Sequence, residues 1–95
     1  MSMNDLFIGR KVLVRATNSG VHFGTLVERD GQEVLLEKAR RIWSWSGALS
    51  LNEIATEGPN LEESKISEEV AEMLVFEAIE IIPIESTSNL FNYNY

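Results

Sequence analysis

The stretch from residue 40 to residue 45 holds the side chains best suited to chemistry in this chain. It reads Arg-Arg-Ile-Trp-Ser-Trp and contains both tryptophans and two of the eight basic residues. In a strand, side chains alternate between two faces, so Arg41, Trp43 and Trp45 are predicted to share one face. Arg40 then points to the opposite face.

A guanidinium beside an indole is a suitable pair for a phosphate-bearing aromatic ligand. The guanidinium binds phosphate oxygens with two parallel hydrogen bonds, and the indole stacks on a base, so no catalytic group is needed. The same pattern also fits aromatic residues in the core of a small barrel, or residues that anchor a subunit interface. The sequence leaves these interpretations open.

Catalytic chemistry has little support. The chain has one histidine, His22, and no cysteine, so a Ser-His-acid triad would depend on His22, and no Gly-x-Ser-x-Gly motif supplies its nucleophile. No spacing of glutamates around His22 indicates a metal site, and a strand histidine with a satisfied hydrogen bond is the commoner case. The paired glutamates are typical of a solvated surface. We therefore expect a protein that is not an enzyme and has no metal or cofactor.

The charge of the chain is divided unevenly. Residues 1–41 carry seven Lys and Arg against five Asp and Glu, whereas residues 42–95 carry one lysine against ten glutamates. Long phosphate backbones need many cations along a groove, so a net charge of −7 disfavours nucleic acid as the partner. A local basic patch can still hold a small anion.

The composition predicts one small domain over residues 1–85, followed by a polar and aromatic tail over residues 86–95. No apolar run approaches the roughly 18 residues of a membrane span, and the first residues do not form a secretory signal. The absence of cysteine removes disulfides and fits any compartment, including the cytoplasm. A chain of 95 residues buries a small core, so we expect a homo-oligomer.

The first half of the chain is predicted to be strands. Residues 12–15 are a first strand, and residues 21–29 alternate as a second. Asp30-Gly31 is the strongest hairpin signal, because glycine supplies the positive φ of a tight turn. A third strand follows over residues 32–36, and the Arg and Trp stretch is predicted to be a fourth.

A short helix is predicted next. Ser50 and Glu53 form a capping box, and Leu49 with Ile54 is placed as the accompanying hydrophobic staple. The helix is expected from residue 51 to residue 57, where Gly58-Pro59 ends it. A polar loop is expected over residues 60–67.

The last third is less regular. Residues 68–77 fit both helical and strand spacing, and propensity slightly favours a helix over residues 68–73. Residues 79–84 are predicted to be a strand that ends near a proline. For the tail, the default is a frayed terminus, and the alternative is docking on a partner subunit.

These elements together predict an α+β fold. We expect a small, strongly bent antiparallel sheet, or a partly open barrel of the SH3-like or Sm-like kind, with about five strands and one short helix before the last of them.

Three blocks of the sequence resemble a known family. They are Gly-Val-His-Phe-Gly over residues 20–24, Arg-Arg-Ile-Trp-Ser-Trp over residues 40–45, and Glu-Ala-Ile-Glu-Ile-Ile-Pro over residues 77–83. Combined, they resemble a family of small phage- and prophage-encoded proteins over roughly residues 8–84. This chain lacks the proline-bearing segment expected around residues 69–71, which leaves the form of residues 68–74 open.

That family is similar to the anti-defence sponge proteins of phages, among them the Thoeris anti-defence type. The resemblance implies an oligomer that sequesters cyclic ADP-ribose or a cyclic oligonucleotide signal, without cleaving it, in the cytoplasm of the infected bacterial cell. The ligand contacts that it implies are Arg40, Arg41, Trp43 and Trp45, with Arg15 and His22 as weaker additions. The alternative is a phage structural or protein-interaction module whose aromatic surface is the interface, and a third interpretation is a nucleic-acid-binding barrel.

Overall fold

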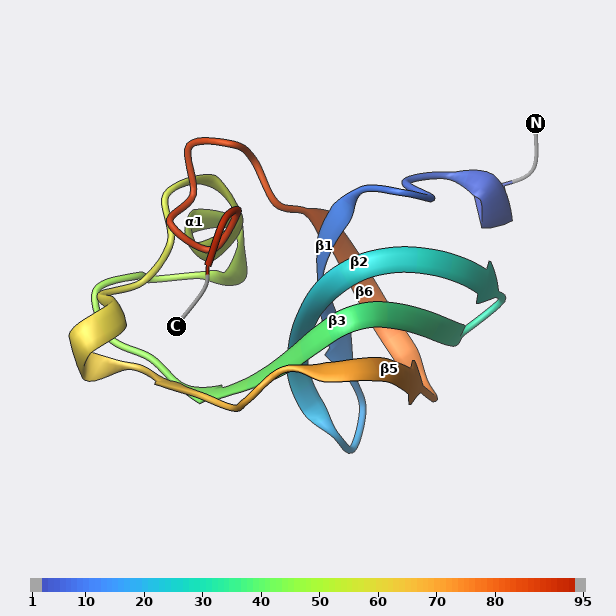
Figure 1. Cartoon of the computed structure of the whole chain (residues 1–95), viewed down its shortest axis with the longest axis horizontal. Helices are drawn as coiled ribbons and strands as arrows, with labels where there is room; N and C mark the ends of the chain where they lie inside the picture. The colour runs from blue at the N-terminus through green and yellow to red at the C-terminus, as the bar shows by residue number, and fades with distance from the viewer. Residues whose placement is uncertain (1–2, 94–95) are drawn as a thin grey trace.

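A computed structural model describes residues 3–93 of the chain (Figure 1). These residues form six strands, one α-helix and two short 3-10 helices. The elements are η1 (Met3–Asp5), β1 (Lys11–Ala16), β2 (Gly20–Asp30), β3 (Glu33–Ser44), α1 (Leu51–Thr56), η2 (Leu61–Glu63), β4 (Lys65–Ile66), β5 (Val70–Val75) and β6 (Ala78–Pro83).

The strands make one strongly bent sheet that does not close into a barrel. Its order is β4-β3-β2-β1-β6, with β5 pairing to a different part of β3, and every pairing is antiparallel. The predicted α+β class is thus confirmed, with the short helix inserted before the last strands. The described residues contain six strands where we expected about five. One reason is that β4 lies inside the predicted loop.

The third and fourth predicted strands are in fact one strand, β3, which is a correction. A bend in β3 takes the place of the predicted break: Lys38 adopts a left-handed backbone with φ of 51°, and the register with β2 shifts at Gly24. A bulge of this kind lets a strand bend without ending. Glycine is required at this point, because a Cβ on Gly24 would lie 2.8 Å from the carbonyl oxygen of Glu37.

The prediction of a helix over residues 68–73 is wrong, because residues 70–75 form β5. This strand pairs with β3, with Leu74 opposite Leu35. Val75 is buried in the core, while Leu74 is 53% exposed, which is the alternation of a half-buried strand. These residues form a strand because β3 has a free edge with which they can pair. Local propensity does not reveal such an edge, so it could not decide between helical and strand spacing.

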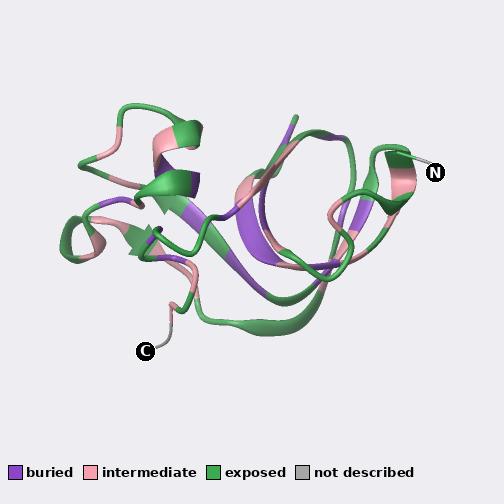
Figure 2. Ribbon diagram, turned by 90° about the horizontal axis from the view of Figure 1, so that it is seen from above, coloured by how far each residue is buried: buried purple, intermediate pink, exposed green. Residues whose placement is uncertain are grey.

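Two hydrophobic clusters hold the fold together, and the inner strands contribute to both. Figure 2 shows buried stretches along the strands of the sheet. On β1, Val12 and Val14 belong to the first cluster and Leu13 to the second, so this strand is buried on both faces. The first cluster is Val12, Val14, Ala16, Leu26, Val34, Leu36, Ala39, Val75 and Ala78. The second joins the sheet to α1 and the tail through Leu13, Phe23, Ile42, Ile54, Ile84 and Leu90.

The helix α1 begins as predicted. The Ser50 hydroxyl accepts a hydrogen bond from the backbone N–H of Glu53 at 3.2 Å, and Ile54 is fully buried. The predicted hydrophobic staple is absent, because Leu49 is 97% exposed. Gly58 follows the helix with φ of 91°, and its N–H donates to the carbonyl of Glu53.

The described part of the tail, residues 86–93, packs on its own chain, which corrects the default of a frayed end. Leu90 is 2% exposed within the second cluster, and the Ser88 hydroxyl donates to the carbonyl of Ile54 at 2.8 Å. Residues 94–95 lie outside the described residues. The packing of the tail brings two aromatic rings over the sheet, next to β1 and β3.

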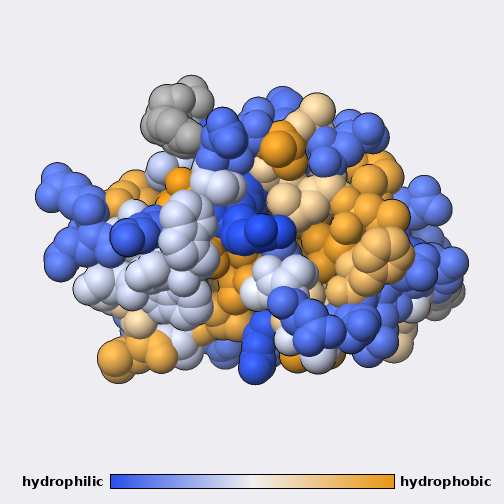
Figure 3. Space-filling model, turned by 90° about the horizontal axis from the view of Figure 1, so that it is seen from below, coloured by the Kyte–Doolittle hydropathy of each residue, from blue (hydrophilic) through white to orange (hydrophobic). Residues whose placement is uncertain are grey.

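Several large apolar side chains stay on the surface near β5. Seen from below, the surface has apolar side chains gathered beside strongly hydrophilic ones (Figure 3). The exposed side chains on or beside β3, β5 and β6 are Trp43, Val70, Leu74, Phe76 and Ile79.

Candidate functional site

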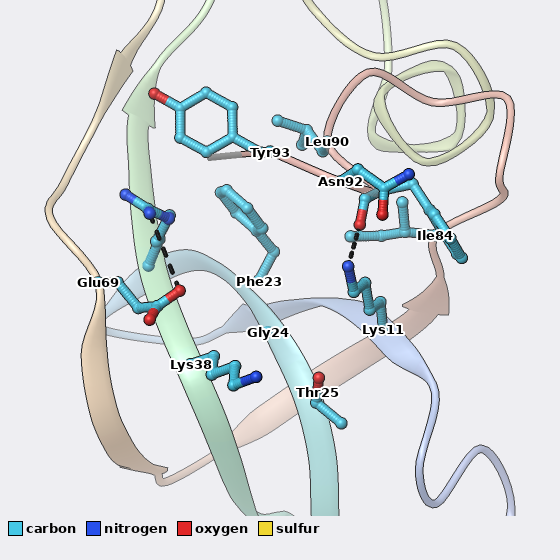
Figure 4. A pocket seen from close by; sticks show the side chains of 12 residues that line it. Lys11, Phe23, Gly24, Thr25, Lys38, Glu69, Ile84, Leu90, Asn92 and Tyr93 are labelled. Carbon is cyan, nitrogen blue, oxygen red and sulfur yellow. Dashed lines mark hydrogen bonds and ion pairs between the residues drawn. The ribbon is translucent and has the colours of Figure 1, made fainter. Parts of the chain in front are cut away.

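A pocket of about 360 Å³ opens between strands β1 to β3 and the tail (Figure 4). We call it the basic pocket, because three cations line it against one carboxylate. Its lining residues are Lys11, Phe23, Gly24, Thr25, Lys38, Arg40, Glu69, Ile84, Leu90, Phe91, Asn92 and Tyr93.

Arg40 enters the basic pocket from β3 and is firmly held there. It is 5% exposed, and its Nη1 donates to the carbonyl of Ser67 at 3.2 Å. Its Nη2 lies 3.8 Å from Oε1 of Glu69. The guanidinium carbon also lies 4.9 Å from the ring centroid of Tyr93, within the range of a cation–π contact. The charge is therefore fixed in position before any ligand arrives.

Lys11 enters from β1, on the opposite side of Phe23 from Glu69 (Figure 4). Its ammonium donates to the carbonyl of Phe91 and lies 4.9 Å from the centroid of the Phe91 ring. The tail thus holds both Lys11 and Arg40, one through each of two aromatic residues.

Lys38 is the third cation of the basic pocket, and it is exposed. The structure gives its ammonium no hydrogen bond or ion pair within residues 3–93. The left-handed backbone at this residue, with φ of 51°, belongs to the bulge that bends β3. Lys38 therefore has a charge available for a ligand without breaking an existing contact.

Aromatic rings form the apolar part of the pocket. The rings of Phe23 and Tyr93 meet edge to face, with centroids 6.1 Å apart and planes at 81°. The backbone of Gly24 continues the same surface without a side chain. Cations next to flat apolar surfaces suit a ligand that has both negative charge and an aromatic ring.

The consecutive arginines lie on opposite faces of β3, as the alternation predicts. Arg41 points away from the basic pocket and lines a hollow of about 180 Å³ with His22. It also lines a second hollow with Trp43, which is 58% exposed. Arg40 and Arg41 therefore do not meet in one site.

His22 is 1% exposed and pairs with Arg41 across β2 and β3. Its Nε2 lies 3.0 Å from the hydroxyl of Ser19, and its Nδ1 has no hydrogen-bond partner among residues 3–93. Burial, and secondarily the charge of Arg41, lower the pKa of His22 from 6.5 to about 4, while a hydrogen bond with the backbone of Ser19 acts in the opposite direction. The imidazole is therefore neutral at pH 7.

The other two predicted contacts lie apart from the basic pocket. Trp45 follows the end of β3 and packs against the second cluster, so it does not share a surface with Trp43. Arg15 is an exposed residue of β1, opposite Val21 and Glu80 on the neighbouring strands. Of the six residues that the sequence nominated, Arg40 alone lines the basic pocket.

The sequence reasoning missed most of this pocket. Lys11, Phe23 and Lys38 come from three strands, and only the topology brings them together. The tail offered one signal, since its aromatic residues are costly to leave exposed, and two of them, Phe91 and Tyr93, do cover the pocket.

The described residues contain neither a candidate metal-binding cluster nor a membrane-spanning helix. No group of three or more His, Asp and Glu side chains that could hold a metal ion occurs within residues 3–93. In the same part of the chain, no helix is long and apolar enough to cross a membrane.

Comparison with known proteins gives one match. A family described as a domain of unknown function, DUF6948, matches residues 9–90. This segment contains all six described strands, the helix α1 and the tail as far as Leu90. No curated protein and no solved structure matches the chain. The chain belongs to the DUF6948 family.

Proposed function

We propose that this protein binds a nucleotide-derived signal molecule in the basic pocket and holds it without changing it chemically. The observation that carries the proposal is the gathering of Lys11, Lys38 and Arg40 around rings of the sheet and tail. The resemblance to phage anti-defence sponges suggests the setting, in which a cyclic ADP-ribose or cyclic oligonucleotide signal is sequestered in an infected bacterial cell.

The division of roles within the pocket follows from its chemistry. Lys38 and the ordered guanidinium of Arg40 would contact phosphate oxygens, and the surface of Phe23 and Tyr93 would contact the base. A nanomolar complex corresponds to about 12 kcal/mol. Two charge-assisted contacts of roughly 1.5 to 3 kcal/mol each and a stacked base of roughly 1 to 3 kcal/mol give about 4 to 9 kcal/mol, so nanomolar binding also needs Lys11 and the remaining pocket surface to contact the ligand.

Binding without turnover fits the position of the one histidine. His22 lines the hollow beside Arg41 and not the basic pocket, so it does not face a ligand bound there. Sequestration needs affinity alone, and the cations and aromatic rings of the basic pocket would supply it.

The test starts with purified protein and a panel of cyclic ADP-ribose isomers and cyclic di- and trinucleotides. Each is incubated with the protein, which is then denatured by heat, and the released ligand is analysed by mass spectrometry. We expect one class to be retained and released intact. Release of a cleaved product in catalytic amounts, or retention of no member of the panel, would contradict the proposal.

The position of the site is tested with a pair of lysine variants. Lys38→Ala removes the available cation of the pocket, and we expect about tenfold weaker binding by calorimetry. Lys65→Ala is the matched control, since Lys65 is an exposed lysine of β4 that does not line the pocket. An equal loss of affinity in both variants would show a general effect of charge, and it would contradict the assignment of the basic pocket as the binding site.

We also propose that the protein is a homo-oligomer. Among the described strands β6 pairs with β1 alone, and Ile79 on it is 50% exposed, so its outer edge needs cover. Light scattering at micromolar concentration should give a multiple of 10.7 kDa. A mass equal to that of one chain would contradict this part of the proposal.

A further inference from the structure

A groove runs along β5 on the side of β3 away from the basic pocket. One hollow is lined by Arg41, Trp43, Ser67, Glu68, Val70 and Met73, and it adjoins the hollow between the β1–β2 turn and residues 73–77. The two hollows share Arg41 and Met73, so they form one continuous surface. We call this surface the β5 groove.

The backbone of β5 is open on this side. Among the described strands, β5 pairs with β3 and with no other. A strand with one unpaired edge has a row of N–H and C=O groups that an extended chain can bind by main-chain hydrogen bonds.

Large, exposed apolar side chains line the groove. The exposed fractions are 58% for Trp43, 41% for Val70, 53% for Leu74 and 57% for Phe76. The view from below in Figure 3 shows apolar side chains gathered on this side of the molecule. Several such residues on one surface indicate a protein-binding site more than scattered single residues do.

The charge along β5 selects the kind of partner. Glu68 and Glu77 line the groove, and Glu72 lies between them on the strand, whereas Arg41 is the cation in the lining. The register places Glu72 directly opposite Glu37 of β3, a like-charge pair that is unfavourable unless a cation lies nearby. A second copy of β5 would bring a further set of glutamates and no lysine or arginine, so its charge does not match.

We propose that the β5 groove binds an extended, basic segment of a partner protein, which adds to the sheet as a strand beside β5. Lysine or arginine side chains at alternate positions would pair with the glutamates and stack on Trp43. The apolar residues between them would face the opposite side of the strand, where Met73 lines the groove. This site is independent of the nucleotide proposed for the basic pocket.

The probe is a fluorescein-labelled peptide of about eight residues, the length of a typical strand, that alternates lysine and valine. Its binding to the full chain is followed by fluorescence anisotropy. Two control peptides are used: one has the same residues in two blocks, and the other alternates glutamate and valine. We expect the alternating basic peptide alone to bind. No binding by it, or equal binding by either control, would overturn the proposal.

Two charge-reversal variants locate the peptide. Glu72→Lys should weaken binding by about tenfold and should not unfold the protein, because it also relieves the repulsion with Glu37. Glu62→Lys makes the same charge change on η2, at an exposed residue outside the groove lining, and should leave binding unchanged. Equal weakening by both variants would mean that the peptide binds through non-specific charge attraction, and the β5 groove would no longer be supported as its binding site.

Strand addition has its own signature. Backbone amides of residues 70–75 should exchange more slowly with solvent deuterium when the basic peptide is bound. Binding without this protection would contradict the proposal that the peptide adds to the sheet as a strand beside β5. Self-association that Leu74→Ser abolishes, with no peptide binding, would assign the groove to a second copy instead and would also overturn the proposal.

Discussion

Arg40 and Arg41 are neighbours in the chain, but they belong to two different surfaces. Arg40 is 5% exposed and bound to a backbone carbonyl, a carboxylate and the ring of Tyr93, inside a pocket that is rich in cations. Arg41 is exposed, and it lies in a groove where glutamates and apolar side chains predominate. A strand thus turns a run of two like residues into two separate environments.

The difference shows that residue type alone does not define a binding site. A cation that is already fixed by several partners offers a ligand a preorganised charge at little entropic cost. A cation on an exposed surface has its conformational freedom still to lose, so it contributes less unless a partner covers it. The basic pocket therefore suits a small anion, and the groove suits an extended chain that covers a larger surface.

The sharpest test of the comparison is the stability of alanine variants at the two positions. Arg40→Ala removes a charged hydrogen bond and a cation–π contact from a buried site, so we expect a loss of about 3 kcal/mol in the free energy of unfolding. Arg41→Ala should stay within about 0.5 kcal/mol of the parent protein. Urea unfolding followed by circular dichroism measures both, and equal losses would break the distinction between the two surfaces.

The pH dependence of stability tests the surroundings of His22, which lines the groove beside Arg41. The pKa of His22 is lowered from 6.5 to about 4 in the folded protein, so the unfolded chain binds the proton more readily between these values. Stability is therefore complete above pH 6.5 and falls as the pH drops towards 4. Between pH 7 and pH 5 we expect His22 to account for a loss of about 2 kcal/mol.

Two variants test that assignment. His22→Gln should remove this part of the pH dependence, as measured by urea unfolding at each pH. Arg41→Ala should reduce it, because the positive charge of Arg41 helps to lower the pKa of His22. An unchanged slope in His22→Gln would mean that another group titrates in this range.

The sequence predicted local features well and surfaces formed by several elements poorly. The Asp30-Gly31 turn, the Ser50 cap and the alternation of Arg40 and Arg41 depend on neighbouring residues, and each is present in the structure. Residues 70–75 form a strand because β3 offers a pairing edge, which no local pattern shows.

The basic pocket could not be predicted from the sequence for the same reason. Lys11 and Lys38 are 27 positions apart and reach one pocket through the order of β1, β2 and β3. Phe91 and Tyr93 join it only after the tail folds back over the sheet. Side-chain chemistry could be identified along the chain, but its assembly depends on pairings between distant segments.

The smallest expected effect separates binding from stability within the basic pocket. Lys38 has a φ of 51°, a conformation that glycine adopts without the steric cost of a Cβ. In Lys38→Gly the relief of this cost exceeds the entropy lost on folding, so we expect the protein to gain about 0.5 kcal/mol of stability. The same change removes the available cation, so nucleotide binding should weaken as it does in Lys38→Ala.

Thermal unfolding and calorimetry on both variants should give equal losses of affinity but a higher melting temperature for the glycine variant alone. A fall in melting temperature in both would instead mean that the Lys38 side chain supports the bulge of β3, and the weaker binding would then reflect a distorted pocket.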